Sequence, residues 1–320
     1  MGLILLWAHL VRADDVCLAW GEAGALTDAD VEATESSGVV ASSIEDGLYY
    51  TLDDSGGAAS LYMFDETGAF RGEQLIQGAT NTDWEDLASG PCPAAVDANA
   101  CLYIADIGDN HEERDSVTLW VVPESRETIV DAVACPLTYP DGPHDAETLL
   151  VVPADGMNPG AVRLASKEND GEARIYEVDA LTCGATPDVL QKEAKVTLDG
   201  PATGGTMTST TVVIRTLSSA WVWQDCTIGA STWDATPEEL DLGADPQGEA
   251  IGVTSDGGFI TTSESTPFRF RLIPCAETGS PKCAPCGCAT GSTSFSWVGG
   301  VIVAWGMGRR ARRSPTGRAP

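Results

Sequence analysis

Residues 84–139 read WEDLASGPCPAAVDANACLYIADIGDNHEERDSVTLWVVPESRETIVDAVACPLTY, and this stretch decides the fold class. It opens at Glu85 and continues with three short runs rich in Val, Ile, Leu, Tyr and Thr, at 101–106, 117–122 and 135–139. Gly, Pro and Asp separate the runs, and no helical periodicity of 3.6 residues connects them. Such runs predict β-strands, so we interpret the stretch as one unit of four antiparallel strands.

Other parts of the chain can be aligned with this unit. Copies open at Glu35, Glu147 and Glu249, and an irregular copy without a glutamate starts at Thr206. Repeated four-strand units of about fifty residues predict a β-propeller of five blades, or of six if the irregular region contains two. A β-sandwich is the main alternative, but it has no reason to repeat a strand that opens with glutamate. The last unit lacks a fourth strand, which Val16–Trp20 would supply and so close the ring.

The charge of the chain is strongly negative, with 48 acidic against 18 basic residues and a formal net charge of -30. Such a body repels nucleic acid and anionic membranes and favours cations. We therefore expect no nucleic-acid partner. An acidic surface also serves solubility, so divalent-ion binding does not follow from charge alone.

The N-terminal residues 1–13 contain a short apolar run that ends in Val11-Arg12-Ala13. This ending is typical of a signal peptide, although the usual basic start is missing. A buried strand is the alternative. We expect a propeller domain at 14–280 in a protein that is exported and surface-displayed or secreted.

Residues 281–320 differ in composition from the rest. They contain a cysteine motif at 283–288, an apolar run at 295–307 and an arginine cluster at 309–313. This order resembles the MYXO-CTERM sorting domain of bacterial surface proteins, which implies processing at Cys286 or Cys288 and retention at the outer surface. An ordinary single-span anchor is the alternative. Either way we expect membrane contact only through this tail, and a monomeric protein.

The ten cysteines indicate disulfides, because exported proteins fold in oxidising compartments. Cys92 and Cys101 flank a polar loop and form the best local pair. Cys17 with Cys275 and Cys135 with Cys183 are the other pairings that we consider. A zinc site at the motif of residues 283–288 would have too few partners, since the chain contains only three histidines.

The glutamates that open the units are expected to meet at one mouth of the central channel. In a propeller the first strand of each blade lines the channel, and the second strand runs antiparallel, so its end lies beside the start of the first. Polar side chains recur at both places. The candidate ligand-binding residues are Glu35, Glu85, Asp86, His144, Glu147, Lys167, Arg215 and Glu249.

Carboxylates that converge in this way repel one another unless protons or a cation intervene. Calcium accepts six to eight oxygen ligands in flexible geometry, so we expect Ca²⁺ as the cofactor. The candidate metal ligands are Asp54, Asp106, Asp109, Glu85, Glu147 and Glu249. Two alternatives stay open: the aspartates cap turns, and Lys167 and Arg215 neutralise the acids in a purely structural network.

Residues 35–275 resemble secreted bacterial propellers of the phytase/esterase-like and gluconolactonase-like group, through short motifs such as Glu85-Asp86-Leu87 and Glu249-Ala250-Ile251. That resemblance implies channel-mouth acids that hold calcium, and it transfers no catalytic residue. We expect a calcium-binding module that binds a ligand or interaction partner. A metal-assisted ester or phosphoester hydrolase is the alternative, and a passive structural protein is the third hypothesis.

Overall fold

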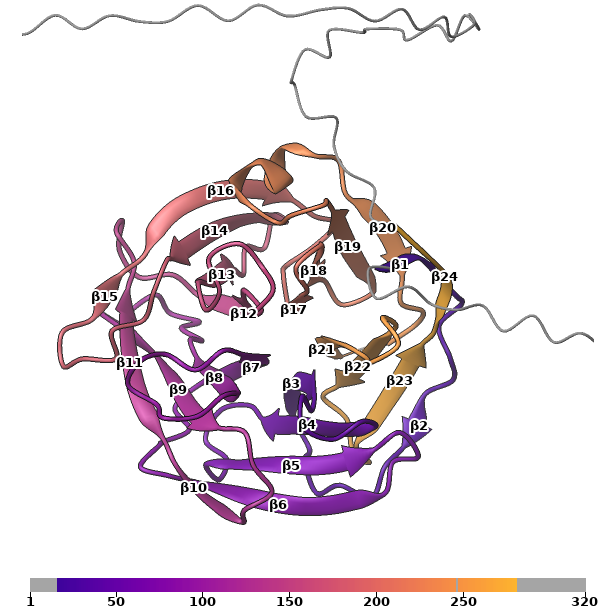
Figure 1. The fold of residues 1–320 in the computed structure, drawn as a ribbon, viewed down its shortest axis with the longest axis horizontal. Helices are drawn as coiled ribbons and strands as arrows, with labels where there is room; N and C mark the ends of the chain where they lie inside the picture. The colour runs from indigo at the N-terminus through magenta and orange to yellow at the C-terminus, as the bar shows by residue number, and fades with distance from the viewer. Residues whose placement is uncertain (1–15, 246, 281–320) are drawn as a thin grey trace, which may run out of the picture. The chain divides into compact units, whose positions relative to one another are not determined.

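The computed structural model describes residues 16–245 and 247–280. Five antiparallel sheets are arranged in a ring around a central axis, which confirms the five-bladed propeller (Figure 1). The predicted signal peptide and sorting tail lie outside the described residues. Within the residues that are described, no helix is long and apolar enough to cross a membrane.

Each blade begins with an inner strand and proceeds outward through hairpins. The first blade consists of β3 (Ser36–Ala41), β4 (Leu48–Asp53), β5 (Ser60–Asp65) and β6 (Phe70–Gln77). The second consists of β7 (Trp84–Gly90), β8 (Cys101–Asp106), β9 (Val117–Pro123) and β11 (Val133–Thr138). The third consists of β12 (Ala146–Val151), β13 (Val162–Ser166), β14 (Glu172–Val178) and β16 (Gln191–Thr197). The inner strands of neighbouring blades contact one another around the axis.

The last two blades complete the ring. The fourth consists of β17 (Gly204–Met207), β18 (Thr211–Arg215), β19 (Ser219–Gln224) and β20 (Glu238–Asp241), with the 3-10 helix η1 (Ala230–Asp234) before β20. The fifth consists of β21 (Gly248–Val253), β22 (Phe259–Ser263), β23 (Arg269–Ile273) and the short β2 (Thr27–Asp28). The irregular region is therefore one blade, and the prediction of a sixth is not needed.

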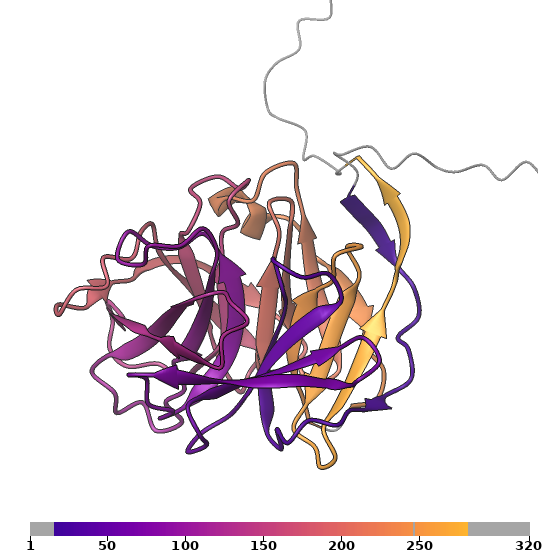
Figure 2. The same cartoon turned by 60° about the horizontal axis from the view of Figure 1, so that its bottom comes forward.

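The N-terminal segment closes the ring, as expected, but a different strand does so. Thr27–Asp28 of β2 pairs with β23, whereas Val16–Trp20 forms β1 and pairs with β24 (Cys275–Gly279). This two-stranded ribbon lies at the outer edge of the ring (Figures 1 and 2). The disulfide between Cys17 and Cys275 joins its two strands.

Two outer edges carry an additional strand that four-strand units did not predict. β10 (Ile129–Asp131) runs parallel to β6 of the first blade, and β15 (Asp188–Val189) runs parallel to β11 of the second. β10 comes from the second blade, between β9 and β11, and β15 comes from the third blade, between β14 and β16. Both cover an edge whose backbone groups would otherwise be free to pair with another molecule.

The core lies between the blades. Five clusters of buried apolar side chains each join two neighbouring sheets. Two further disulfides, Cys92–Cys101 and Cys135–Cys183, confirm the remaining pairings that the sequence suggested. Three disulfides in the described part of the chain indicate an extracellular or periplasmic protein.

Candidate functional site

Three inner strands contain a β-bulge at their first glutamate. The pairing registers skip Glu85 in β7, Glu147 in β12 and Glu249 in β21. A bulge re-aims a side chain out of the regular alternation. In the first blade the skipped residue is Ser37. The register therefore corrects the repeat alignment in that blade, because Ser37 and not Glu35 occupies the equivalent position, and Glu35 is exposed just before β3.

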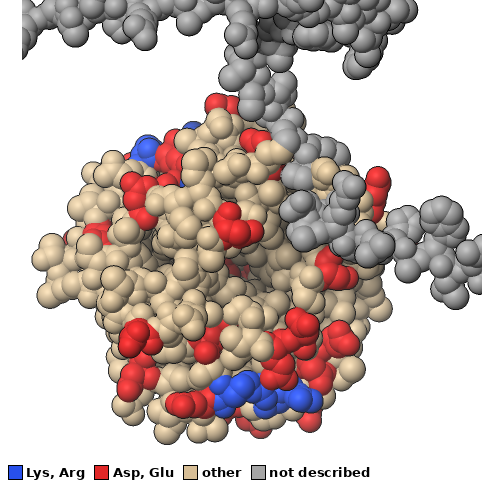
Figure 3. Space-filling model, viewed as in Figure 1, with Lys and Arg blue, Asp and Glu red and all other residues tan. Residues whose placement is uncertain are grey.

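The bulged glutamates belong to a group that we call the axial acidic cluster: Asp54, Asp83, Glu85, Glu147 and Glu249. Asp54 follows β4 and Asp83 precedes β7, at the same end of the inner strands. Carboxylate oxygens of Asp54, Asp83 and Glu85 all lie within 4.8 Å of one another. On the face drawn in Figure 3, acidic side chains are spread around a hollow at the centre of the ring.

A glycine makes room for two of these carboxylates. A Cβ atom on Gly108 would overlap with Oε1 of Glu85 and would lie 2.5 Å from Oδ2 of Asp83. Gly108 also donates its backbone N–H to the carbonyl of Asp83, at 3.2 Å. The backbone of the loop after β8 thus lies directly against the cluster, and any larger residue at this position must displace the two carboxylates.

One lysine neutralises part of the cluster. Nζ of Lys167, which follows β13, forms an ion pair with Oε1 of Glu147. The other oxygen of Glu147, Oε2, is buried without a hydrogen-bond partner, and so is Oδ1 of Asp54. Glu147 itself is only 5% exposed. Two acceptors in this acidic group therefore remain unpaired within residues 16–245 and 247–280.

The cluster holds its protons more tightly than free carboxylic acids do. Burial raises the pKa of Glu147 to about 8, against the opposing effect of Lys167. Burial also raises the pKa of Glu249 to about 7 and that of Asp54 to about 6. The pKa of Glu85 is raised well above its usual value by burial and then by the charges of Glu147 and Asp54. Protons or a cation must therefore balance this charge.

Two predicted metal ligands, Asp106 at the end of β8 and Asp109 in the loop after it, already have other partners. Asp106 accepts hydrogen bonds from Nη2 of Arg114 at 2.8 Å and from Nε1 of Trp120 at 3.3 Å. Asp109 accepts the backbone N–H groups of Glu113 and Arg114, at 2.9 and 2.8 Å. Asp109 therefore matches the turn-capping alternative, whereas Asp106 is held mainly by side-chain donors.

Asp86 lies deeper in the channel, where it joins three blades. It is fully buried, and its Oδ1 accepts the N–H of Leu87 at 2.8 Å. Its Oδ2 accepts the N–H of Leu149 from the third blade at 2.8 Å and that of Gly205 from the fourth at 3.2 Å. These contacts satisfy the carboxylate with backbone donors alone.

Arg215 is also fully buried, and its charge opposes the burial that raises the pKa of Glu249, but its hydrogen bonds go to backbone carbonyls. Nη1 donates to the carbonyls of Ala250 and Thr262 in the fifth blade, at 2.7 and 3.2 Å. Its nearest carboxylate is that of Asp245, at 3.9 Å. Burial lowers its pKa to about 10, because a buried charge loses hydration. The side chain thus joins the fourth blade to the fifth.

His144 lies in a separate group of side chains before β12. Its Nε2 is 3.0 Å from Oδ1 of Asp141 and 2.8 Å from the hydroxyl of Tyr176. Its ring packs edge-on against Tyr139. Lys192 pairs with the same aspartate, at 2.8 Å. No carboxylate of the axial acidic cluster takes part in these contacts.

Sequence reasoning did not name Asp83 and Gly108 as site residues. Asp83 stands two places before Glu85, in the loop that enters an inner strand, and that position was the available signal. Gly108 lies in the segment Asp106-Ile107-Gly108-Asp109, which was considered for its oxygen ligands. Gly108 contributes because it has no side chain, which leaves room for the carboxylates. This role depends on how the loop packs against the acids, and the sequence does not show that packing.

Comparison with known proteins gives similarity at the level of the fold. No protein-family model matches the chain, and no curated protein matches it. Among solved structures, soluble aldose sugar dehydrogenase from Escherichia coli is 9% identical, with a TM-score of 0.48 over 78% of this chain and 99% of that chain. A putative glucose dehydrogenase from Thermus thermophilus is 8% identical, with a TM-score of 0.44 over 78% and 99%. The nidogen/laminin complex gives 12% identity and a TM-score of 0.39 over 71% and 72%.

Proposed function

We propose that the chain is an exported propeller, displayed at the cell surface, whose axial acidic cluster binds calcium and which acts as a binding or interaction module. The observation that carries this proposal is the pair of unpartnered buried oxygens, on Glu147 and Asp54, within a group of raised-pKa carboxylates. A hard cation beside such an oxygen would supply its missing partner and replace the protons that the cluster otherwise needs.

The spacing of the carboxylates supports this choice of ion. Calcium binds oxygen ligands at about 2.3–2.6 Å, so ligands on opposite sides of one ion lie roughly 5 Å apart. Asp54, Asp83 and Glu85 offer oxygens within 4.8 Å of one another. The donor set consists of carboxylates without cysteine or histidine, which favours calcium or magnesium over zinc and copper. The role of Lys167 would be to neutralise Glu147 when no ion is bound.

Burial separates this proposal from the hydrolase alternative. Glu85 and Glu147 are 4% and 5% exposed, so little of either carboxylate faces a substrate from solution. The basic groups near the cluster are not available, since Lys167 pairs with Glu147, Arg114 pairs with Asp106, and Arg215 is fully buried. These basic groups are therefore not free to bind the phosphate of a phosphoester substrate. Holding an ion requires less open space than turning over an ester.

The first test is a thermal melt of the full chain, stripped with a chelator and titrated with calcium. We expect saturating calcium to raise Tm by about 5–10 °C, since ligand at a hundredfold excess over Kd adds about 2.7 kcal/mol to the free energy of unfolding. Glu85→Gln and Asp54→Asn should lose most of that rise. Glu238→Gln, on the exposed outer strand β20, is the matched control and should keep it. An unchanged Tm in the wild type would refute the calcium site.

A second test uses the glycine beside the cluster. We expect Gly108→Ala to weaken calcium binding by about tenfold or more, because its methyl group must displace the carboxylates of Glu85 and Asp83. Gly57→Ala is the control: it lies in the loop of Asp54, and its Cβ would meet Asp53 at an ordinary 3.4 Å. Isothermal titration with calcium measures both. Equal affinities in the two variants would show that the Glu85–Asp83 pair does not hold the ion.

A further inference from the structure

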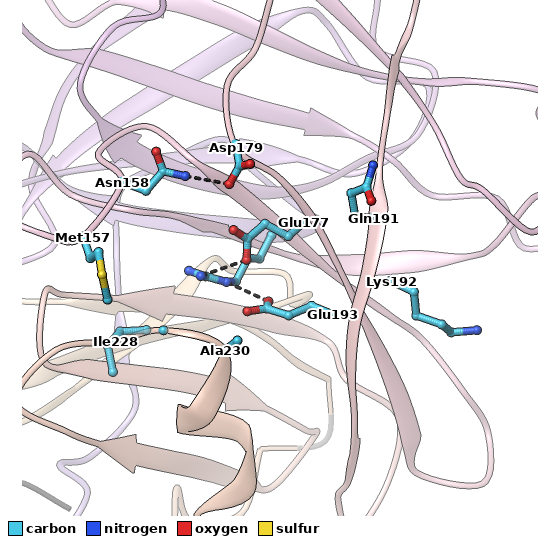
Figure 4. Close-up of a pocket in the computed structure, with 11 residues that line it drawn as sticks. Met157, Asn158, Glu177, Asp179, Gln191, Lys192, Glu193, Ile228 and Ala230 are labelled. Carbon is cyan, nitrogen blue, oxygen red and sulfur yellow. Dashed lines mark hydrogen bonds and ion pairs between the residues drawn. The ribbon is translucent and has the colours of Figure 1, made fainter. Parts of the chain in front are cut away.

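A cavity of about 410 Å³ lies between the third and fourth blades, away from the axis. Arg163, Glu177 and Glu193 line it from β13, β14 and β16, and residues 228–230 line it from the segment that leads into η1. Figure 4 shows Met157, Ile228 and Ala230 on one side of this lateral cavity and the two glutamates facing them. None of its lining residues belongs to the axial acidic cluster.

The polar wall of the lateral cavity holds a buried arginine that is only partly satisfied. Arg163 is 4% exposed, and its Nη2 pairs with Oε2 of Glu177 at 2.9 Å while its Nε pairs with Oε2 of Glu193 at 2.8 Å. Its Nη1 has no hydrogen-bond partner in the described part of the chain, and neither has Oε1 of Glu193. A buried donor and a buried acceptor that form no hydrogen bond each cost free energy. A ligand with the complementary groups would recover it.

Both orphan atoms are on residues that line the lateral cavity. They belong to two side chains that are joined by a single ion pair, so they lie within a few bond lengths of each other. Nη1 requires an acceptor, and a carboxylate suits a guanidinium best. Oε1 of Glu193 requires a donor, and an ammonium group suits a carboxylate best. A molecule with both groups on neighbouring atoms satisfies the pair.

The charge of the polar wall fits a ligand without net charge. Burial and the neighbouring Glu193 raise the pKa of Glu177 to about 7, although Arg163 opposes this. Near neutral pH Glu177 is therefore about half protonated, and its protonated form leaves one positive charge on Arg163 and one negative charge on Glu193. An anion alone or a cation alone would unbalance that pair, whereas a zwitterion keeps it balanced.

The opposite wall is apolar and partly open. Ile228 is buried, and Met157 is 58% exposed at the edge of the lateral cavity. Flexible methionine side chains adapt to aliphatic ligands of different shape. We propose that the lateral cavity binds a small aliphatic zwitterion of the free α-amino acid type, with its carboxylate on Nη1 of Arg163, its ammonium on Oε1 of Glu193 and its side chain against Met157 and Ile228.

The test compares three probes on the full chain by isothermal titration: L-leucine, 3-methylbutylamine and 4-methylpentanoate. The last two keep the aliphatic body but lack the carboxylate or the ammonium group. We expect leucine to bind, and we expect each analogue to bind at least about tenfold more weakly, because each loses one charged hydrogen bond. Absence of leucine binding in the millimolar range would overturn the proposal. So would equal affinity for the amine, since Nη1 of Arg163 would then be unused.

A blocking variant locates the binding without disturbing the buried ion pairs. Gly229 lines the lateral cavity in extended backbone, and a Cβ there would meet Cε of Met157 at 3.4 Å, an ordinary contact. Gly229→Leu should therefore fold and abolish leucine binding. Gly200→Leu is the matched control, because a Cβ at Gly200 meets no atom within 4 Å. Leucine binding that survives in Gly229→Leu would place the ligand elsewhere and refute the proposal.

Discussion

Replacing Asp86 by alanine should lower Tm by about 10 °C or more. The reason is that three backbone N–H groups, of Leu87, Leu149 and Gly205, donate to this one buried carboxylate. Each donor left unpaired in the core costs about 1–3 kcal/mol, so the free energy of unfolding should fall by roughly 5 kcal/mol. Because Leu149 and Gly205 belong to different blades, the loss falls on the contacts that hold the ring together at its axis.

Two comparison variants separate the role of Asp86 from that of aspartate in general. Asp65→Ala removes a carboxylate that accepts the N–H groups of Thr67 and Ala69 in a solvent-exposed turn. We expect its cost to be about 1 kcal/mol, since water replaces the lost acceptor. The loss of stability in Asp86→Asn should lie between these two. Its amide oxygen can still accept backbone N–H groups, but its NH2 group faces the donors that the other carboxylate oxygen accepted. Chemical denaturation measures all three, and equal midpoints for Asp86→Ala and Asp65→Ala would contradict the bridging role.

The blades were predictable from sequence because their signal is local. Short apolar runs separated by Gly, Pro and Asp directly indicate strand and turn. The buried strand Cys101–Asp106, for example, appears as an almost continuous apolar run. The repeated glutamates were also visible, since three of them mark the same bulge in three inner strands. Both features require only residues that are close along the chain.

The register and the closure of the ring were not predictable in the same way. In the first blade no glutamate marks the bulge, so Glu35 was aligned where Ser37 belongs. The closing strand β2 contains only two residues, Thr27–Asp28, too few for an alternating pattern. Val16–Trp20 gave the stronger strand signal, yet it pairs with the C-terminal β24. Pairing across the whole length of the chain decides these points.

The candidate site was predictable as a group but not residue by residue. Glu85, Glu147 and Glu249 were expected at one mouth of the channel, and their raised pKa values share burial as the main cause. The partners of Asp106 and Asp109 could not be foreseen, because Arg114 turns back onto the loop that precedes it. Which acids remain unpaired depends on such side-chain choices, and these determine where an ion could bind.

The axial acidic cluster should give the protein opposite pH dependences with and without calcium. Asp54, Glu249 and Glu147 have folded-state pKa values of about 6, 7 and 8, against ordinary values of 3.8 for aspartate and 4.5 for glutamate. Between these limits the folded chain binds more protons than the unfolded chain, so its stability must fall as pH rises. Lys167 keeps its proton in this range, because the nearby glutamates outweigh burial and raise its pKa further.

We therefore expect the chelator-treated protein to melt about 10 °C higher at pH 5 than at pH 8, since each pKa unit corresponds to about 1.4 kcal/mol. The interval avoids the acid range in which Asp65 and Asp199, whose pKa values are lowered, would lose their contributions. Saturating calcium should remove or reverse this slope, because the ion binds the deprotonated cluster and its stabilisation grows as protons leave. Glu147→Gln should reduce the slope of the calcium-free profile, because the other raised carboxyl groups remain, while the exposed control Glu238→Gln should leave the slope unchanged. A calcium-free protein that is more stable at pH 8 would mean that these carboxylates are already paired, and then neither protons nor an ion would be needed at the axis.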